Sequence, residues 1–136
     1  MHKSAQQAAS AYRQTEVQSR TPLELVVMLY DGALRSIAQA RDALERKDIR
    51  ARRDGISRAM SVISELQSTL DMEKGGAISE KLDGLYVYIN DRLIEATKKQ
   101  DAGPLEEAAR LLTTLRDAWA EIARDTAATA PGRITR

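Results

Sequence analysis

The feature that most limits how this chain can fold is the recurrence of apolar residues at steps of three and four along four successive segments. Such spacing places the side chains on one face of an α-helix. The expected core faces are Val26, Leu29, Ala33, Ile37, Ala40 and Leu44; Ile56, Ala59, Ile63, Leu66 and Leu70; Ile78, Leu82, Leu85, Ile89, Leu93 and Ala96; and Leu105, Ala108, Leu112, Leu115 and Trp119. The sequence therefore predicts four helices that bury their apolar faces against one another.

Local signals mark where these helices begin and end. Thr21 is expected as an N-cap, with Pro22 at the first helical position and Glu24 completing a capping box. Asp48 is a plausible second N-cap, and a glycine pair should break the chain at residues 73–76. The expected helices are Pro22 to about Arg46, about Ile49 to Met72, about Ile78 to Lys99, and Pro104 to about Arg124.

The connections between these helices are short, which favours antiparallel neighbours. The expected fold class is all-α, an antiparallel up-down-up-down four-helix bundle with a mobile N-terminal arm. At 136 residues the chain fits one domain. Residues 21–125 should form the bundle and residues 1–20, rich in Ser, Gln and Ala, the arm. Residues 126–136 show no periodicity and are expected to be a disordered tail.

The composition argues against an enzyme. Cysteine is absent and the one histidine, His2, lies at the start of the chain. Nucleophile-base pairs that need a thiol or an imidazole cannot be assembled from these residues. No cofactor or metal site is expected, because the paired Glu-x-x-His motifs of a di-iron bundle are missing.

The charge and hydropathy of the chain limit the classes of partner that it is expected to bind. The formal net charge is +1, and the basic residues between Arg46 and Arg58 alternate with acidic ones. No aromatic side chain among them offers a base a stacking platform, so nucleic-acid binding is not expected. The chain has neither an apolar run near the roughly 20 residues of a membrane span nor a signal peptide. A cytoplasmic protein without membrane insertion is the simplest expectation.

The first helix carries more apolar residues than one core face requires. From Leu23 to Tyr30 every residue except Glu24 is apolar or aromatic. A surface helix normally shows a single apolar stripe, so this segment needs cover on more than one side. Leu25, Val27 and Met28 fall outside the expected core face.

The third helix has a similar surplus. Val87 and Ile94 are seven residues apart and off the expected stripe, and Tyr86 and Tyr88 flank it on either side. These residues favour an apolar binding groove. The alternative is ordinary surface, since more than half of a protein surface is apolar.

Several individual residues keep two interpretations. Tyr12 and Val17 of the arm could pack on this surface permanently. Gly32 lies inside a helix, where glycine costs about 1 kcal/mol relative to alanine. It suggests either close approach by another backbone or simple crowding between helices. Asp31 could accept a hydrogen bond from an incoming main-chain amide, or it could be solvated.

A set of short motifs resembles a known family. The matching positions are Ala11-Tyr12, Thr21-Pro22, Leu25-Val26, Met28-Leu29-Tyr30-Asp31-Gly32-Ala33, Lys47-Asp48, Leu70-Asp71-Met72-Glu73-Lys74-Gly75-Gly76, Leu85-Tyr86-Val87-Tyr88, Arg92-Leu93, Ala96, Arg116 and Trp119. Together they resemble the flagellar secretion chaperones of the FliS type, over about Ala11 to Ile122. Two positions depart from the family pattern, Ser36 in place of a larger apolar residue and His2 in place of a tyrosine.

The resemblance implies a function. It implies a bundle that binds the disordered C-terminal segment of flagellin, prevents premature polymerisation in the cytoplasm and helps deliver it to the export gate. The client-binding residues implied by the matching motifs are Met28, Tyr30, Asp31, Gly32, Tyr86, Val87, Tyr88, Arg92 and Ile94. Tyr12 and Val17 would form a displaceable lid.

Two other expectations concern partners. A general helical adaptor, which captures an amphipathic helix of a regulator or export component, is the alternative function. Spaced anchors in one groove would favour that adaptor, whereas apolar sites on several helices favour a wrapping client. Self-association of a client-free groove is possible.

Overall fold

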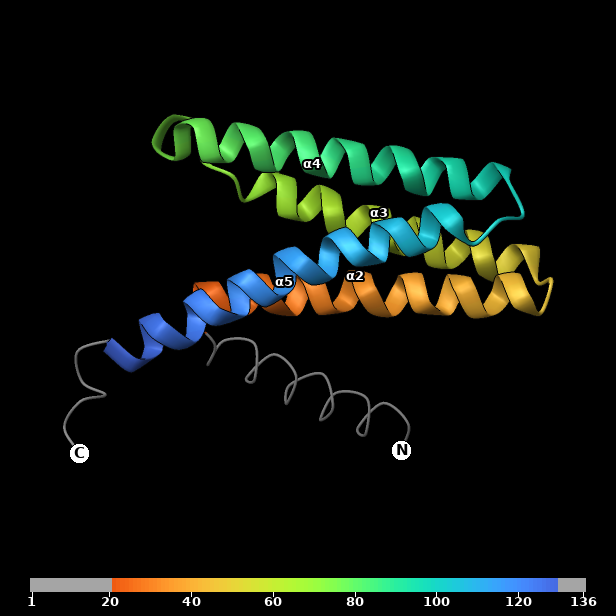
Figure 1. Ribbon diagram of the computed structural model, residues 1–136, viewed down its shortest axis with the longest axis horizontal. Coiled ribbons are helices and arrows are strands. Elements are labelled where there is room, and N and C mark those ends of the chain that lie inside the picture. The colour runs from red at the N-terminus through yellow and green to blue at the C-terminus, as the bar shows by residue number, and fades with distance from the viewer. Residues whose placement is uncertain (1–20, 130–136) are drawn as a thin grey trace, which may run out of the picture.

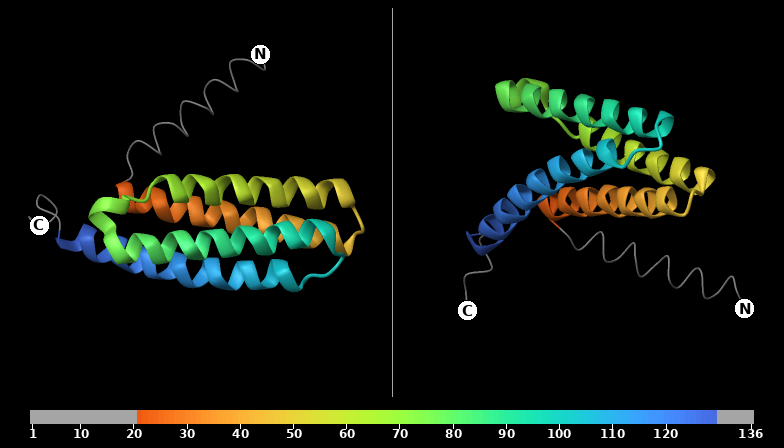
Figure 2. Two further views of the ribbon diagram at one scale, coloured as in Figure 1. Left: turned by 90° about the horizontal axis from the view of Figure 1, so that it is seen from above. Right: turned by 45° about the vertical axis from the view of Figure 1, so that its right-hand side comes forward.

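The computed structural model describes residues 21–129, and these form four helices (Figure 1). They are α2 (Pro22–Glu45), α3 (Ile49–Ser68), α4 (Met72–Lys98) and α5 (Gly103–Thr129). Consecutive helices run in opposite directions, and α2 and α4 each pack against both α3 and α5 (Figure 2). The predicted all-α, up-down-up-down bundle is confirmed. None of these four helices combines the length and apolar character needed to cross a membrane.

The expected helix starts are present at α2 and α3. The amide of Glu24 donates to Thr21 Oγ1 at 3.1 Å, and the amide of Thr21 donates to Glu24 Oε1 at 2.9 Å, which completes the capping box. Asp48 caps α3 by accepting from the amide of Ala51 at 3.0 Å. These local signals were sufficient to place both helix starts.

The connection between α3 and α4 lies earlier than predicted. Helix α3 ends at Ser68 rather than Met72. Asp71 accepts from the amides of Glu73 at 3.1 Å and Lys74 at 2.9 Å, so α4 begins at Met72, before the glycine pair. The glycine break instead becomes a kink inside α4, where Gly76 adopts φ +52° and ψ −127°. An aspartate cap thus starts the helix ahead of the residues expected to interrupt it.

The inward face of α4 also differs from the prediction. Ile78 is 70% exposed and Leu85 lies at the surface, whereas Ser79 and Tyr86 are buried. Ser79 Oγ donates to the carbonyl of Asp71 at 3.0 Å, which holds this serine inward. The buried positions of α4 continue through Ile89, Leu93 and Ala96, as expected.

The end of α5 corrects the predicted tail. The helix continues to Thr129 rather than stopping near Arg124, so residues 126–129 are helical. Alanine has the highest helix propensity, and the alanines in this stretch favour its continuation. The predictions for the arm, residues 1–20, and for residues 130–136 lie outside the described part of the chain.

Small residues bring α2 and α3 close together. A Cβ added at Gly55 of α3 would lie 2.9 Å from the carbonyl oxygen of Ser36 and 3.1 Å from Ala40 Cβ. Ser36 is itself buried in α2. The backbones of α2 and α3 therefore lie close together at Gly55, where a larger residue would push them apart.

Candidate functional site

An apolar cleft opens at the end of the bundle where α2 begins. Its volume is about 650 Å³. Figures 1 and 2 show α4 and α5 diverging toward this end. We call it the end cleft, and its apolar wall comprises Leu23, Leu25, Val26 and Leu29 of α2, Leu70, Ile78 and Leu82 at and beyond the α3–α4 connection, and Trp119 of α5. The cleft offers hydrocarbon surface from three of the four helices and the α3–α4 connection.

Two tyrosines lie between the end cleft and the core. Tyr30 of α2 and Tyr86 of α4 share a hydrogen bond between their hydroxyls at 2.5 Å, with ring centroids 6.4 Å apart. Tyr30 is 0% exposed and Tyr86 is 2% exposed, although Tyr86 lines the cleft. Burial raises the pKa of both phenols, so both stay neutral at physiological pH. The bond satisfies two buried polar groups and joins two helices that otherwise have few contacts.

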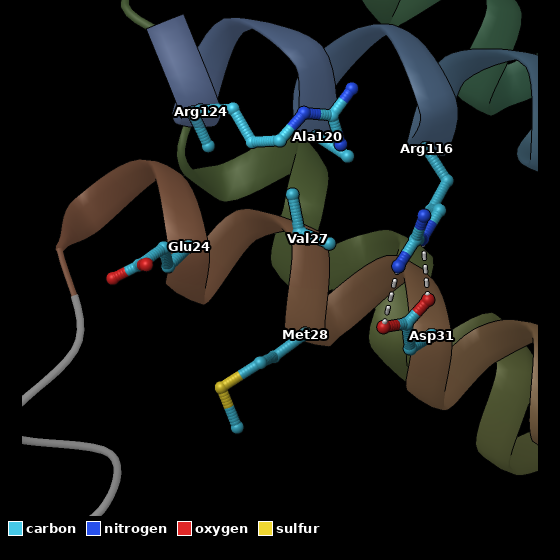
Figure 3. Close-up of a pocket in the computed structure, with 8 residues that line it drawn as sticks. Glu24, Val27, Met28, Asp31, Arg116, Ala120 and Arg124 are labelled. Atoms are coloured by element: carbon cyan, nitrogen blue, oxygen red, sulfur yellow. Dashed lines mark hydrogen bonds and ion pairs between the residues drawn. The ribbon is translucent and has the colours of Figure 1, made fainter. Parts of the chain in front are cut away.

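A second hollow, the α2–α5 groove, lies on the other side of the start of α2. Its volume is about 520 Å³, and Figure 3 shows the residues that line it. Val27 of α2 projects toward Ala120 of α5, and Met28 extends away from α5. Arg116 closes one end of the groove with Asp31, through Nε to Oδ1 at 2.8 Å and Nη2 to Oδ2 at 3.5 Å.

These two hollows explain the apolar surplus of α2. Leu25 and Val26 line the end cleft, and Val27 and Met28 line the α2–α5 groove. The first turns of α2 therefore form a ridge between two hollows. The end cleft is mostly apolar, and the α2–α5 groove combines apolar with charged residues. The sequence predicted cover on more than one side, and within the described residues both sides remain only partly covered.

A third apolar surface lies on α4. Val87, Tyr88 and Ile94 are large exposed residues there. The Tyr88 hydroxyl donates to Glu107 Oε2 at 2.6 Å, and Arg92 Nε donates to Glu107 Oε1 at 2.8 Å, which ties α4 to α5. The hydrogen bond from Tyr88 lowers the pKa of Glu107 and, in turn, raises the pKa of Tyr88. Glu107 of α5 therefore accepts hydrogen bonds from two side chains of α4 and is not a freely solvated carboxylate.

The structure separates the predicted site residues into three groups. Met28 and Asp31 line the α2–α5 groove, while Val87, Tyr88, Arg92 and Ile94 lie on α4 or at its contact with α5. Tyr30 and Tyr86 are buried, which corrects the expectation that Tyr86 lies off the core. Tyr12 and Val17, which the sequence predicts as a lid, lie outside the described residues.

Gly32 does not mark a close helix crossing. A Cβ added there would meet only Arg35 Nη2, at 3.7 Å, apart from its chain neighbours and the backbone of its own helix. Crowding between helices is therefore wrong as an explanation of Gly32 within residues 21–129. The close crossing occurs at Gly55, which the sequence analysis did not single out.

Several residues of the end cleft were missed. The sequence predicts only a core role for Leu70, Ile78, Leu82 and Trp119, whereas the structure places them in the wall of the cleft. The topology of the bundle could have identified these residues as part of the cleft. In an up-down bundle the second connection lies at the same end as the start of the first helix. The apolar residues beside residues 69–76 could therefore have been placed next to Leu23 and Val26.

Among residues 21–129, no group of three or more His, Cys, Asp or Glu side chains gathers in a way that could hold a metal ion. What the three surfaces offer is apolar area, joined by an ion pair and a carboxylate bridge at their edges. Such surfaces suit the binding of another polypeptide.

Comparison with known proteins agrees with this geometry. The model of the family "Flagellar protein FliS" matches residues 4–126. The flagellar secretion chaperone FliS of Salmonella typhimurium is 38% identical over 117 residues, which cover 82% of this chain and 87% of that protein. FliS of Bacillus subtilis is 36% identical over 110 residues, covering 81% of each chain. FliSB of Pseudomonas aeruginosa is 34% identical, covering 85% of this chain and 94% of that protein. With a match that spans most of its length, the chain belongs to the FliS family of flagellar proteins.

Proposed function

We propose that this protein is a cytoplasmic flagellar export chaperone that binds the disordered C-terminal segment of flagellin. By occupying that segment it would prevent premature polymerisation, and it would assist delivery of flagellin to the export apparatus. The observation that carries the proposal is the end cleft, an apolar hollow of about 650 Å³ in a protein whose relatives are named flagellar secretion chaperones. It acts by binding, and no catalytic step is proposed.

The distribution of apolar surface supports a client that wraps around the bundle. The end cleft, the α2–α5 groove and the exposed face of α4 involve different helices. A disordered segment that folds on binding can cover such separate surfaces, at the cost of its ordering entropy. A rigid amphipathic helix would need its anchors in a single groove, so this spread disfavours the adaptor alternative.

The N-terminal arm suits the role of a lid. The chain enters α2 at Thr21, and Pro22 and Leu23, directly after it, line the end cleft. Residues 1–20 are therefore tethered at the rim of the cleft. We propose that Tyr12 and Val17 cover part of this apolar surface when no client is bound and yield to flagellin.

Calorimetric titration with the C-terminal segment of flagellin from the same organism tests the proposal. At two temperatures we expect one-to-one binding with a large negative heat-capacity change, because apolar surface is buried. Met28→Glu places a charge in the α2–α5 groove and should weaken binding by at least about tenfold, the effect of about 1.4 kcal/mol.

The matched control is Ile49→Glu. Ile49 is also a large exposed apolar residue, but it begins α3 at the opposite end of the bundle. We expect this variant to bind as the wild type does. A folded wild-type protein that gives no heat at either temperature and no complex would contradict flagellin binding, and equal losses in both variants would contradict the assigned surface.

A further inference from the structure

A small cavity lies at the opposite end of the bundle from the end cleft. We call it the turn cavity; its volume is about 100 Å³ and it lies between the α2–α3 turn and the link from α4 to α5. Its lining residues are Ala43, Leu44, Lys47, Asp48, Ile49, Arg52 and Gln100. A cavity of this size has room for a small polar group.

A buried cation lines this cavity. Arg52 of α3 is only 4% exposed. Its Nη2 donates to the carbonyl of Thr97 at 3.4 Å, a long hydrogen bond, and its buried Nε has no hydrogen-bond partner. Among residues 21–129 no carboxylate lies within ion-pair distance of its guanidinium. A guanidinium stays charged at all physiological pH values, and a buried charge without a counter-charge is strongly unfavourable.

A second basic residue, Lys47, lines the same cavity and has an unusual backbone conformation. Lys47 has φ +61°, the only positive φ of a non-glycine residue in the described chain. It ends α2 with its amide donating to the carbonyl of Leu44 at 3.1 Å, and the amide of Asp48 donates to Ala43 at 2.9 Å. Glycine is the preferred residue in such a helix-ending turn. The cavity therefore has a lysine where the backbone favours glycine.

The acidic residue of the cavity does not neutralise these two cations. Asp48 Oδ1 accepts from the amide of Ala51 at 3.0 Å as the cap of α3, and Oδ2 lies 3.6 Å from Arg46 Nη1. Both oxygens of Asp48 thus face other groups. The negative charge of Asp48 also repels a dianion such as phosphate more strongly than it repels a group with a single charge.

We propose that the turn cavity is a binding site for a single carboxylate group. The Arg52 guanidinium, which lines the cavity, would bind the carboxylate through charge-assisted hydrogen bonds. Lys47, which also lines the cavity, would add a second positive charge near the carboxylate. A carboxylate is small enough to fit a cavity of about 100 Å³. This site is separate from the surfaces assigned to flagellin, and it does not depend on that assignment.

Nuclear magnetic resonance of the isotope-labelled full-length protein tests the site. The protein is titrated with sodium acetate, with sodium chloride at equal ionic strength as the reference. We expect acetate to shift the Arg52 Nε–H signal and the amide signals of Lys47, Asp48 and Gln100 in a saturable way. Sodium phosphate is the third arm, and it should shift these signals less than acetate does.

Two variants separate binding from folding. Lys47→Gly removes a cation while supplying the residue that the backbone prefers, so the variant should fold at least as well as the wild type and bind acetate about tenfold more weakly. Arg52→Gln should also lose the acetate response at the amides. Arg50→Gln, an exposed arginine two residues earlier in α3, is the matched control and should keep it.

The outcomes decide the proposal. Saturable acetate shifts that Lys47→Gly and Arg52→Gln weaken and Arg50→Gln preserves would support it. Shifts that match the chloride reference, or that persist in Lys47→Gly, would overturn it. A response to phosphate alone would overturn the carboxylate assignment.

Discussion

Helix α2 packs differently along its length than it does at its start. Where α2 passes α3, small residues such as Ser36, Ala40 and Gly55 bring the backbones together. At the start of α2 the apolar residues are large, and Leu23, Val26 and Leu29 line an open cleft instead of a closed core. Along one helix, small residues therefore allow the backbones to pack closely, whereas the large apolar residues at the helix start leave apolar surface accessible.

The largest expected contrast between these regions is in the free energy of unfolding. Ile63 is fully buried, so Ile63→Ala should destabilise the protein by about 2–5 kcal/mol, through lost burial and a residual cavity. Ile78 lines the end cleft and is 70% exposed, so Ile78→Ala should change stability by less than about 0.5 kcal/mol. Denaturant unfolding monitored by circular dichroism measures both.

The variants Ile63→Ala and Ile78→Ala also test whether the end cleft binds flagellin. Ile78→Ala should weaken flagellin binding although it leaves the fold intact. Equal stability losses in the two variants would show that the end cleft is part of the closed core, and the comparison would then fail.

Glycine substitutions give the next largest contrast. Gly55→Ala should destabilise the bundle by about 1–3 kcal/mol, because the added methyl group would meet the Ser36 carbonyl at 2.9 Å and the backbones must separate. Gly84→Ala in α4 is the control, since nothing lies within 4 Å of an added Cβ. It should stabilise the protein by about 0.5–1 kcal/mol, by helix propensity. Thermal unfolding of the two variants checks the opposite signs.

The tyrosine pair lies at the boundary between the two regions. Tyr30→Phe or Tyr86→Phe removes one hydroxyl and the hydrogen bond between the two rings, so each change should cost about 1 kcal/mol. The double variant should cost less than the sum of the single ones, because each single variant already removes the same hydrogen bond. Additive losses in this double-mutant cycle would show that the two hydroxyls do not interact.

The smallest expected effect is the pH dependence of the α4–α5 contact. The hydrogen bond from Tyr88 and the charge of Arg92 lower the pKa of Glu107. The contribution of Glu107 to stability is therefore fully present above the ordinary glutamate pKa and is lost as the pH falls through the lowered one. Glu107→Gln should flatten the loss of thermal stability below about pH 4.5, near the ordinary glutamate pKa.

The exposed Glu80 offers a control for this pH dependence. Glu80→Gln removes an exposed carboxylate of α4 that takes no part in the hydrogen bonds of Tyr88 and Arg92 to Glu107. A profile of Glu107→Gln identical to that of the wild type would show that the bridge to Tyr88 and Arg92 has no energetic weight.

Much of the fold could be predicted from the sequence. Local signals act over three or four residues, and so Thr21, Glu24 and Asp48 revealed the starts of α2 and α3. The face of α4 could not be predicted in the same way. Whether Leu85 or Tyr86 turns inward depends on a partner 56 residues away, the hydroxyl of Tyr30, and periodicity allows both choices.

The site was only partly predictable for the same reason. The surplus of apolar residues around Met28 could be predicted from the sequence. A segment that is apolar on all sides can be recognised without knowing which elements it packs against. The end cleft was not, since it forms where α2, the α3–α4 connection and Trp119 meet in space. The kink at Gly76 was expected as a helix end, because sequence patterns cannot show that the cap at Asp71 comes first.

The position of Trp119 has a practical consequence. The chain has a single tryptophan, and its side chain lines the end cleft. Indole emission depends on the polarity of its surroundings, so the intrinsic fluorescence of this protein reports from one wall of the cleft without any added dye. Emission at shorter wavelength after mixing with a polypeptide would then indicate, in real time, that the cleft has lost contact with water.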